Sequence, residues 1–269
     1  MRFIFGAVAV AGLCACSGSG TSVAVVDLPA DRTENSGTVM SFTISADGKT
    51  LTADTGSSST DAPIDAVPNV GDFIVALDRT GSNSIIALNQ TEDGFAGIGV
   101  IPEGGFETSG VTYGRIGPAS APEFGSADYS GDYLAVFIDT STDGFYMIPD
   151  VTGRGISGDF ALSLDFAGMT ASGSITDRQL IDFLTGDEVA GGSVEDVTLA
   201  ESMWDEDGFL SGDTSGGSAS LGANTSVAAN GRYQAYIVGD EASGVVGMIR
   251  IPHDFGDAVT ERGAFVVNR

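Results

Sequence analysis

The sequence predicts an all-β protein, in which a small antiparallel β unit precedes an eight-stranded up-and-down antiparallel β-barrel. Two observations carry this prediction. The chain has 39 glycines among 269 residues, and its apolar residues fall in short alternating runs that end at Gly, Asp, Asn or Ser. Long stretches with helical apolar spacing are almost absent. The exception is the segment 177–184, for which one or two helical turns are expected.

Residues 38–125 are expected to form the N-terminal, handle-like β unit. An alternating run at 38–45 meets the turn Ala46-Asp47-Gly48 and returns through 50–52, a hairpin by the Asp-Gly rule. Four more strands are expected, at 73–78, 84–88, 95–101 and 111–116. The polar, proline-containing segment 56–69 is interpreted as a loop within this unit.

A segment rich in Pro, Gly and Ser at 117–126 predicts a domain boundary near residue 125, so the barrel is expected at 126–269. Its clearest strand is 158–166, where Phe and Leu alternate with Asp, Ala and Ser and so separate a filled interior from water. The other barrel strands are expected near 129–138, 144–149, 169–176, 194–200, 207–222, 231–238, 244–251 and 262–268. The count is eight or nine, depending on whether residues 145–148 form a strand.

The first residues have the pattern of a bacterial export signal. One arginine precedes the uncharged stretch 3–13, which is too short to span a bilayer as a stable helix. The next residues, Leu13-Cys14-Ala15-Cys16, resemble the lipobox of bacterial lipoproteins, whose cysteine becomes the lipid-carrying first residue of the mature chain. We therefore predict a signal peptide at 1–15, lipidation of Cys16 and a tether at 16–37. A conventional signal peptide and a buried N-terminal strand are the alternatives.

Composition restricts the chemistry of the folded part. Both cysteines, Cys14 and Cys16, lie in the predicted signal, so that prediction leaves no disulfide, thiolate metal site or cysteine nucleophile in the fold. The formal net charge of -26 disfavours binding to nucleic acid and provides no basic patch for anionic lipids. The acyl chain on Cys16 is then the expected link to the membrane. The acidic surface is interpreted first as a feature that keeps the protein soluble. Binding of a basic partner is the alternative.

Residues 126–269 resemble the eight-stranded barrel domain of transferrin-binding protein B-like surface lipoproteins, a group that includes factor H-binding and haem- or haemoglobin-associated lipoproteins. The motifs that carry the resemblance are Tyr-Ser-Gly-Asp-Tyr at 129–133, the strand 158–166 running into 168–174, and the glycine- and aromatic-containing segments 208–212, 231–233, 239–247 and 263–269. The resemblance implies a surface-exposed, outer-membrane binding protein for a protein or a haem- or iron-related ligand, without catalysis. The segment 231–239 departs from the family pattern, and the chain is shorter than the bilobed transferrin receptors, so the partner stays open.

One loop has the spacing of a calcium site. Asp139, Ser141 and Asp143 occupy its first, third and fifth positions before a glycine, and Asp150 is at the twelfth. The same residues are typical of a hairpin turn between two strands, and no flanking helices are predicted. We favour the hairpin, keep calcium as the weaker alternative and predict no cofactor.

Catalytic motifs are few. The only histidine, His253, stands between Pro252 and Asp254 in a predicted turn and is expected to be exposed. No nucleophile elbow, P-loop or paired-histidine metal motif occurs in the sequence. The chain is therefore not expected to be an enzyme.

The single tryptophan, Trp204, precedes the acidic run Asp205-Glu206-Asp207. An exposed Trp among carboxylates would anchor a partner, whereas the more ordinary interpretation is a barrel-end Trp beside a turn.

Three functions follow from these observations. The leading hypothesis is a lipid-anchored outer-membrane protein, displayed at the cell surface, that binds a protein partner without catalysis; a periplasm-facing position is its variant. The second is a passive structural lipoprotein of the envelope. The third is an extracytoplasmic hydrolase whose active site the sequence does not reveal.

Overall fold

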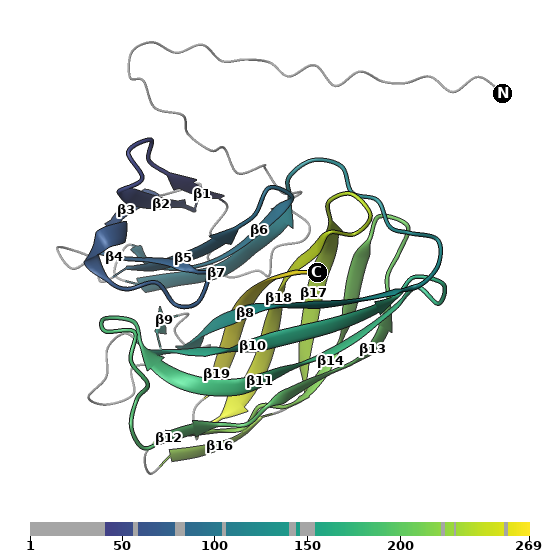
Figure 1. Cartoon of the computed structure of the whole chain (residues 1–269). Coiled ribbons are helices and arrows are strands. Elements are labelled where there is room, and N and C mark those ends of the chain that lie inside the picture. The colour runs from purple at the N-terminus through teal and green to yellow at the C-terminus, as the bar shows by residue number, and fades with distance from the viewer. Residues whose placement is uncertain are drawn as a thin grey trace.

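The computed structural model describes residues 41–55, 59–78, 84–103, 106–139, 144–145, 154–221, 224–228, 230–255 and 258–269. Over these residues the chain is built from antiparallel strands and one short 3-10 helix (Figure 1). The predicted all-β class is therefore confirmed. None of the described helices is long and apolar enough to cross a membrane.

The N-terminal part consists of two small antiparallel sheets. One sheet has the order β1 (Ser41–Ile44), β2 (Thr50–Asp54) and β3 (Ser59–Pro63). The other has the order β4 (Ile74–Leu77), β5 (Ile85–Gln90), β6 (Gly94–Glu103) and β7 (Phe106–Arg115). The two sheets face each other across an apolar cluster that contains Phe42, Leu51 and Phe95.

The prediction of a loop over 56–69 is wrong in part, because this segment contains β3 and the 3-10 helix η2 (Ile64–Ala66). Among the described residues the strand pairs only with β2, and most of its side chains are exposed or half-buried, which suits its polar residues. Its one fully buried residue, Ala62, lies opposite Leu51. A single buried alanine gives too little apolar alternation to mark a strand.

The second part is a closed barrel of eight strands, each antiparallel to the next along the chain. They are β8 (Ser126–Asp139), β10 (Arg154–Asp165), β11 (Thr170–Asp182), β13 (Val197–Met203), β14 (Phe209–Gly216), β17 (Gly231–Val238), β18 (Gly244–Asp254) and β19 (Ala258–Asn268). The last strand closes on the first, with pairs running from Val259 opposite Asp139 to Asn268 opposite Ser130. The predicted up-and-down barrel is confirmed (Figure 1).

Four further short strands lie beside the barrel. β9 (Gly144–Phe145) pairs only with the end of β8, and β12 (Gly192–Val194), β15 (Ala219–Leu221) and β16 (Asn224–Ala228) continue the sheet beyond β18. The single strand predicted at 207–222 is wrong, because it divides into β14 and β15. Gly216, the last residue of β14, and Gly217 have φ of 83° and 87°, a conformation that interrupts an extended chain.

The helical turns expected at 177–184 are also wrong, since β11 continues to Asp182. A β-bulge accounts for the misleading pattern. Asp177 has a φ of 50°, and the register shifts so that two residues of β11, Asp177 and Arg178, lie opposite Gly158 of β10. The extra residue changes the alternation of the strand and turns the Arg178 side chain into the barrel.

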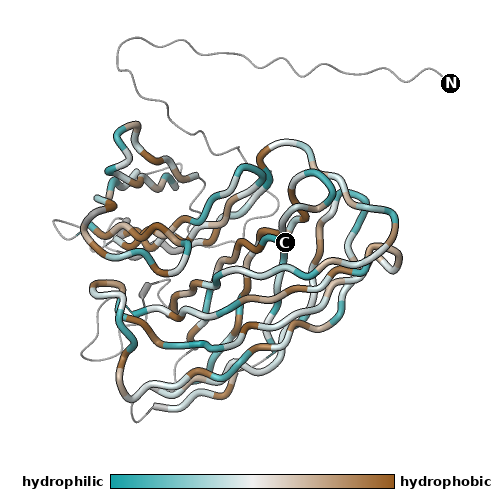
Figure 2. Tube along the Cα trace, viewed as in Figure 1, coloured by the Kyte–Doolittle hydropathy of each residue, from teal (hydrophilic) through white to brown (hydrophobic). Residues whose placement is uncertain are grey.

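Two apolar clusters involve the barrel. The first fills its interior with large side chains, among them Tyr133, Phe160, Leu162 and Phe265. The second lies outside the wall, where alternate residues of β8, β18 and β19 pack against β4 to β7. Where they make this contact, the three strands carry apolar residues on both faces. In Figure 2 the hydrophobic residues of the chain are brown.

Glycine permits close packing where β19 meets β8. A Cβ atom on Gly263 would overlap the ring of Tyr133, which is 1% exposed. A glycine at position 263 therefore lets an aromatic ring approach the backbone.

Candidate functional site

The barrel interior contains a buried polar cluster centred on Glu261 of β19. Tyr133 Oη donates a hydrogen bond of 2.7 Å to Glu261 Oε1, which also accepts one from Arg178 Nη2. His253 Nε2 lies 3.1 Å from Glu261 Oε2. Both Arg178 and Glu261 have side chains with no exposed surface. The second guanidinium nitrogen, Nη1, donates to the carbonyl of Glu195 at 2.5 Å.

The prediction that His253 is an exposed turn residue is wrong. It lies in β18, pairs with Val259 of β19 and is 4% exposed. Pro252 suggested a turn, but β18 continues through it to Asp254. The ring of His253 packs edge-on against Phe137, with centroids 5.2 Å apart.

The electrostatics of this cluster favour a permanent ion pair. Burial opposes ionisation of Glu261, but the charge of Arg178 and the hydrogen bond from His253 outweigh it and lower its pKa to about 2. Burial and the neighbouring Glu261 carboxylate raise the pKa of Tyr133 well above its usual value, so the phenol keeps its proton. Glu261 is thus an acceptor and Tyr133 a donor at every physiological pH.

Ser226, His253 and Glu261 are connected in the order used by serine hydrolases. Ser226 Oγ lies 2.9 Å from His253 Nδ1, and the other ring nitrogen faces the carboxylate. Their surroundings differ from those of a catalytic triad. Ser226 and Glu261 are 0% exposed, and the Glu261 carboxylate already accepts hydrogen bonds from Arg178 and Tyr133. Ser226 has no exposed surface, and the described residues of the cluster fill part of the interior.

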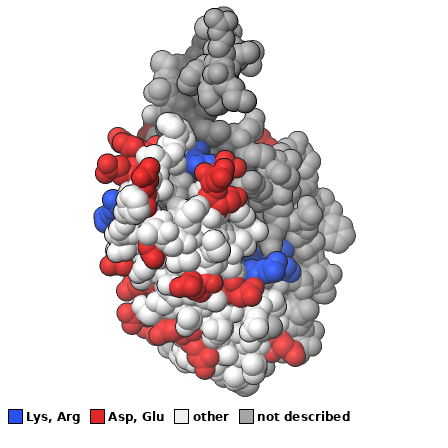
Figure 3. All heavy atoms as spheres, turned by 90° about the vertical axis from the view of Figure 1, so that its right-hand side faces the viewer, with Lys and Arg blue, Asp and Glu red and all other residues white. Residues whose placement is uncertain are grey.

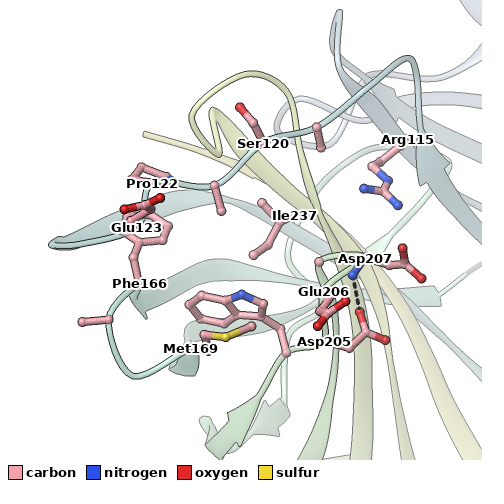
Figure 4. A pocket seen from close by; sticks show the side chains of 15 residues that line it. Arg115, Ser120, Pro122, Glu123, Phe166, Met169, Asp205, Glu206, Asp207 and Ile237 are labelled. Carbon is pink, nitrogen blue, oxygen red and sulfur yellow. Dashed lines mark hydrogen bonds between the residues drawn. The ribbon is translucent and has the colours of Figure 1, made fainter. Parts of the chain in front are cut away.

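An open pocket of about 570 Å³ lies at the end of the barrel where β10 turns into β11 and β13 turns into β14 (Figure 4). Phe166, Met169, Trp204 and Ile237 give it an apolar lining. The rings of Phe166 and Trp204 meet edge to face, with centroids 6.1 Å apart. Trp204 is 6% exposed, which agrees with the interpretation of a barrel-end tryptophan beside a turn.

Carboxylates surround this lining. Glu123, Glu206 and Asp207 are exposed at the pocket. Asp205 has a different role, because its Oδ1 accepts hydrogen bonds of 3.0 Å from the backbone N–H groups of Asp207 and Phe209 and so shapes the turn (Figure 4). Most charged side chains on the right-hand side of the molecule as drawn in Figure 1 are Asp and Glu (Figure 3). The pocket therefore combines an apolar lining with negative charge.

The segment that covers the pocket is fixed to the barrel. Ser120 N–H donates to the carbonyl of Gly239 at 3.0 Å, and its carbonyl accepts from Ala242 N–H at 2.6 Å. Its hydroxyl donates to Asp240 Oδ1 at 2.6 Å and accepts from Glu241 N–H at 2.9 Å. The stretch 117–126, which composition marks as linker-like, is thus tied through Ser120 to the turn between β17 and β18.

A second hollow, of about 420 Å³, lies between residues 69–71 and the barrel wall. Asp132 lines it and accepts a hydrogen bond of 2.5 Å from Asp72 N–H of the N-terminal unit. Burial raises the pKa of Asp132, and the nearby charges of Asp72 and Asp159 add to the effect. This hollow is a polar contact between the two parts of the chain.

Most of the residues predicted to carry chemistry lie outside the described part of the chain, namely Cys16, Ser141, Asp143 and Asp150. Asp139 is the last residue of β8. Among the described residues, no group of three or more His, Cys, Asp or Glu side chains is arranged to hold a metal ion. Lipidation of Cys16 and the weaker calcium alternative stay predictions.

Sequence reasoning missed the partners of His253, although one signal was present. Val259, Glu261, Gly263, Phe265 and Val267 alternate along β19 and share its inward face, so alternation alone would have placed Glu261 in the interior. Arg178 carries no such signal because the bulge at Asp177 shifts the alternation.

The fold and the pocket define a class of protein: a closed barrel filled by its own side chains, with a small β unit packed on the wall. No family model matches the chain, and no curated protein matches it. Solved structures of transferrin-binding protein B, whose family the sequence resembles, are similar in fold. Intact Ap-TbpB with its N and C lobes has 14% identity and a TM-score of 0.42, covering 87% of this chain and 43% of its own.

Two other structures give similar values. A double mutant of Transferrin Binding Protein B from Haemophilus parasuis Hp5 has 13% identity and a TM-score of 0.45, covering 82% of this chain and 40% of its own. The isotype 1 Transferrin binding protein B from serogroup B Neisseria meningitidis has 11% identity and a TM-score of 0.41, covering 78% of this chain and 38% of its own. The chain thus spans less than half the length of each.

Proposed function

We propose that the protein is a non-catalytic binding lipoprotein of the outer membrane, anchored through lipid on Cys16, that binds a protein ligand with the loops at the pocket end of its barrel. One observation carries the proposal. The interior of the barrel is filled by packed side chains, whereas the barrel end has a pocket that is already formed. A ligand is therefore bound on the outside of the barrel.

The distribution of ligating side chains favours a protein over haem or iron. The only histidine is buried in the interior, where Ser226 and Glu261 occupy both ring nitrogens. The predicted signal contains both cysteines. The pocket offers an apolar lining and carboxylates, a combination that suits a polypeptide surface.

The lipobox and the resemblance of residues 126–269 to transferrin-binding protein B-like lipoproteins support the membrane anchor and the surface location. We expect Cys16→Ser to move the protein from the membrane to the soluble fraction, and external protease to digest the wild type on intact cells. Unchanged fractionation of Cys16→Ser would refute the lipid anchor. Protection from protease until the outer membrane is opened would place the protein on the periplasmic side.

Binding is tested with the soluble form, residues 17–269, which contains every described residue. Immobilised on beads, it is expected to retain a specific protein from envelope extracts or from the surrounding medium. Failure to retain any protein would favour the passive envelope lipoprotein. Hydrolysis of ester or peptide substrates that is lost in Ser226→Ala would instead support the cryptic hydrolase.

A further inference from the structure

We propose that the barrel-end pocket binds a segment of the partner that presents a Lys or Arg side chain next to apolar residues. This inference rests on the proposed binding function and specifies the chemistry of the ligand. It combines three independent features of the pocket: its charge, an indole N–H that no described residue accepts, and exposed apolar residues next in sequence to the lining.

The negative charge of the pocket favours a positively charged group on the ligand. Glu123, Glu206 and Asp207 line the pocket as exposed carboxylates, against one basic residue, Arg115. The Arg115 guanidinium lies over the ring of Tyr236, 5.1 Å from its centroid. A positively charged side chain entering the pocket thus meets net negative charge, and an acidic segment is repelled.

The indole of Trp204 supplies a donor that the protein leaves unused. Trp204 as a whole is more than nine-tenths buried and lines the pocket, and no hydrogen bond joins its indole N–H to a described residue, although this nitrogen is not among the fully buried polar atoms without a partner. A carbonyl oxygen of a bound chain would accept a hydrogen bond from this N–H in place of water. This donor favours a polypeptide over a simple cation, because a peptide carries carbonyl groups beside its basic side chain.

Two exposed apolar side chains are next in sequence to residues that line the pocket. Phe124 is 76% exposed and follows Glu123, and Met203 is 70% exposed and precedes Trp204. Large exposed apolar residues beside a pocket are typical of protein-binding surfaces. They provide contact for the apolar neighbours of the basic residue.

The single tryptophan of the chain allows a direct test, because Trp204 reports on the pocket alone. The probe is a capped peptide of about ten residues that alternates Arg and Leu, compared with the same peptide carrying Glu in place of Arg. We expect a saturable change in Trp204 fluorescence with the Arg peptide only, and weaker binding as salt screens the charges.

A matched pair of variants separates the pocket from general charge. Glu206→Gln with Asp207→Asn removes two pocket carboxylates, while Asp205, which shapes the turn, is kept. This variant is expected to bind the Arg peptide about tenfold more weakly, as the loss of two exposed ion pairs predicts. Asp187→Asn with Glu188→Gln makes the same change in net charge near the opposite end of the barrel, and its affinity should change less than about twofold.

Three outcomes would overturn the inference: no saturable signal, equal weakening in both variant pairs, or binding of the Glu peptide. The retention experiment then shows which proposal has failed. If the wild type and the Glu206→Gln, Asp207→Asn variant retain the same partner equally, the binding function stands and the pocket is not its site. If neither retains a partner, the binding function itself is contradicted.

Discussion

Arg178 and Glu261 form an ion pair across the interior of the barrel, between strands β11 and β19 that are not neighbours in the sheet. Neither side chain is exposed to water. A buried charge is tolerated only when a partner and hydrogen bonds replace its hydration, and here Tyr133, His253 and the Glu195 carbonyl supply further hydrogen bonds, although Arg178 Nε has none. The ion pair therefore connects β11 and β19 across the interior of the barrel.

Removal of one charge from this pair should be strongly destabilising. Glu261→Gln leaves the Arg178 guanidinium buried without a counter-charge, and we expect the free energy of unfolding to fall by about 3–5 kcal/mol. Equilibrium denaturation in urea measures the change.

An exposed ion pair on the surface of the barrel provides the matched control for Glu261→Gln. Asp213 and Arg232 approach within 3.6 Å, with side chains 72% and 78% exposed, so Asp213→Asn should cost less than about 1 kcal/mol. Equal losses for Glu261→Gln and Asp213→Asn would show that the interior pair has no special role.

The lowered pKa of Glu261 predicts how stability depends on pH. Its pKa is about 2 in the folded protein against 4.5 as the reference value, so its contribution is complete above about pH 4.5 and is lost as pH falls toward 2. Protonated Glu261 resembles the amide of Gln. The difference in unfolding free energy between the wild type and Glu261→Gln should therefore shrink from pH 5 to pH 2.5. A constant difference across this range would contradict the assigned ion pair.

The close contact at the β19–β8 seam predicts the effect of a methyl group. Gly263→Ala would force the Cβ into the buried ring of Tyr133, and we expect a loss of about 1–3 kcal/mol from overpacking. Thermal unfolding followed by circular dichroism measures it. Gly168→Ala is the control, since the atoms nearest its Cβ belong to the side chains of exposed Asp165 and half-buried Thr170, which can move. Similar losses in both variants would show that the contact with Tyr133 has no specific effect.

Much of the fold could be predicted because its signals are local. The alternation of Phe and Leu in 158–166 identifies β10, and the Asp47-Gly48 turn identifies the first hairpin. The prediction of helical turns at 177–184 failed because a bulge at Asp177 breaks the alternation of the strand. A bulge depends on the opposing strand as much as on its own residues.

The sites were less predictable, because they depend on closure of the barrel. Arg178 and Glu261 are 83 residues apart and meet only when the sheet closes. The barrel-end pocket combines Arg115, Phe166, Trp204 and Ile237 from four separate segments. Trp204 and its acidic neighbours were singled out from sequence, but their pocket was not, since the apolar lining comes from distant turns.

Photo-crosslinking in living cells tests the central claim most directly. A photoreactive amino acid in place of Met203, which is 70% exposed beside the pocket, is expected to give one predominant adduct with a protein partner. The same amino acid in place of exposed Glu188, near the opposite end of the barrel, should give none. A specific adduct from position 188 with none from position 203 would contradict binding at the barrel end, and the absence of adducts at both positions would contradict a binding function.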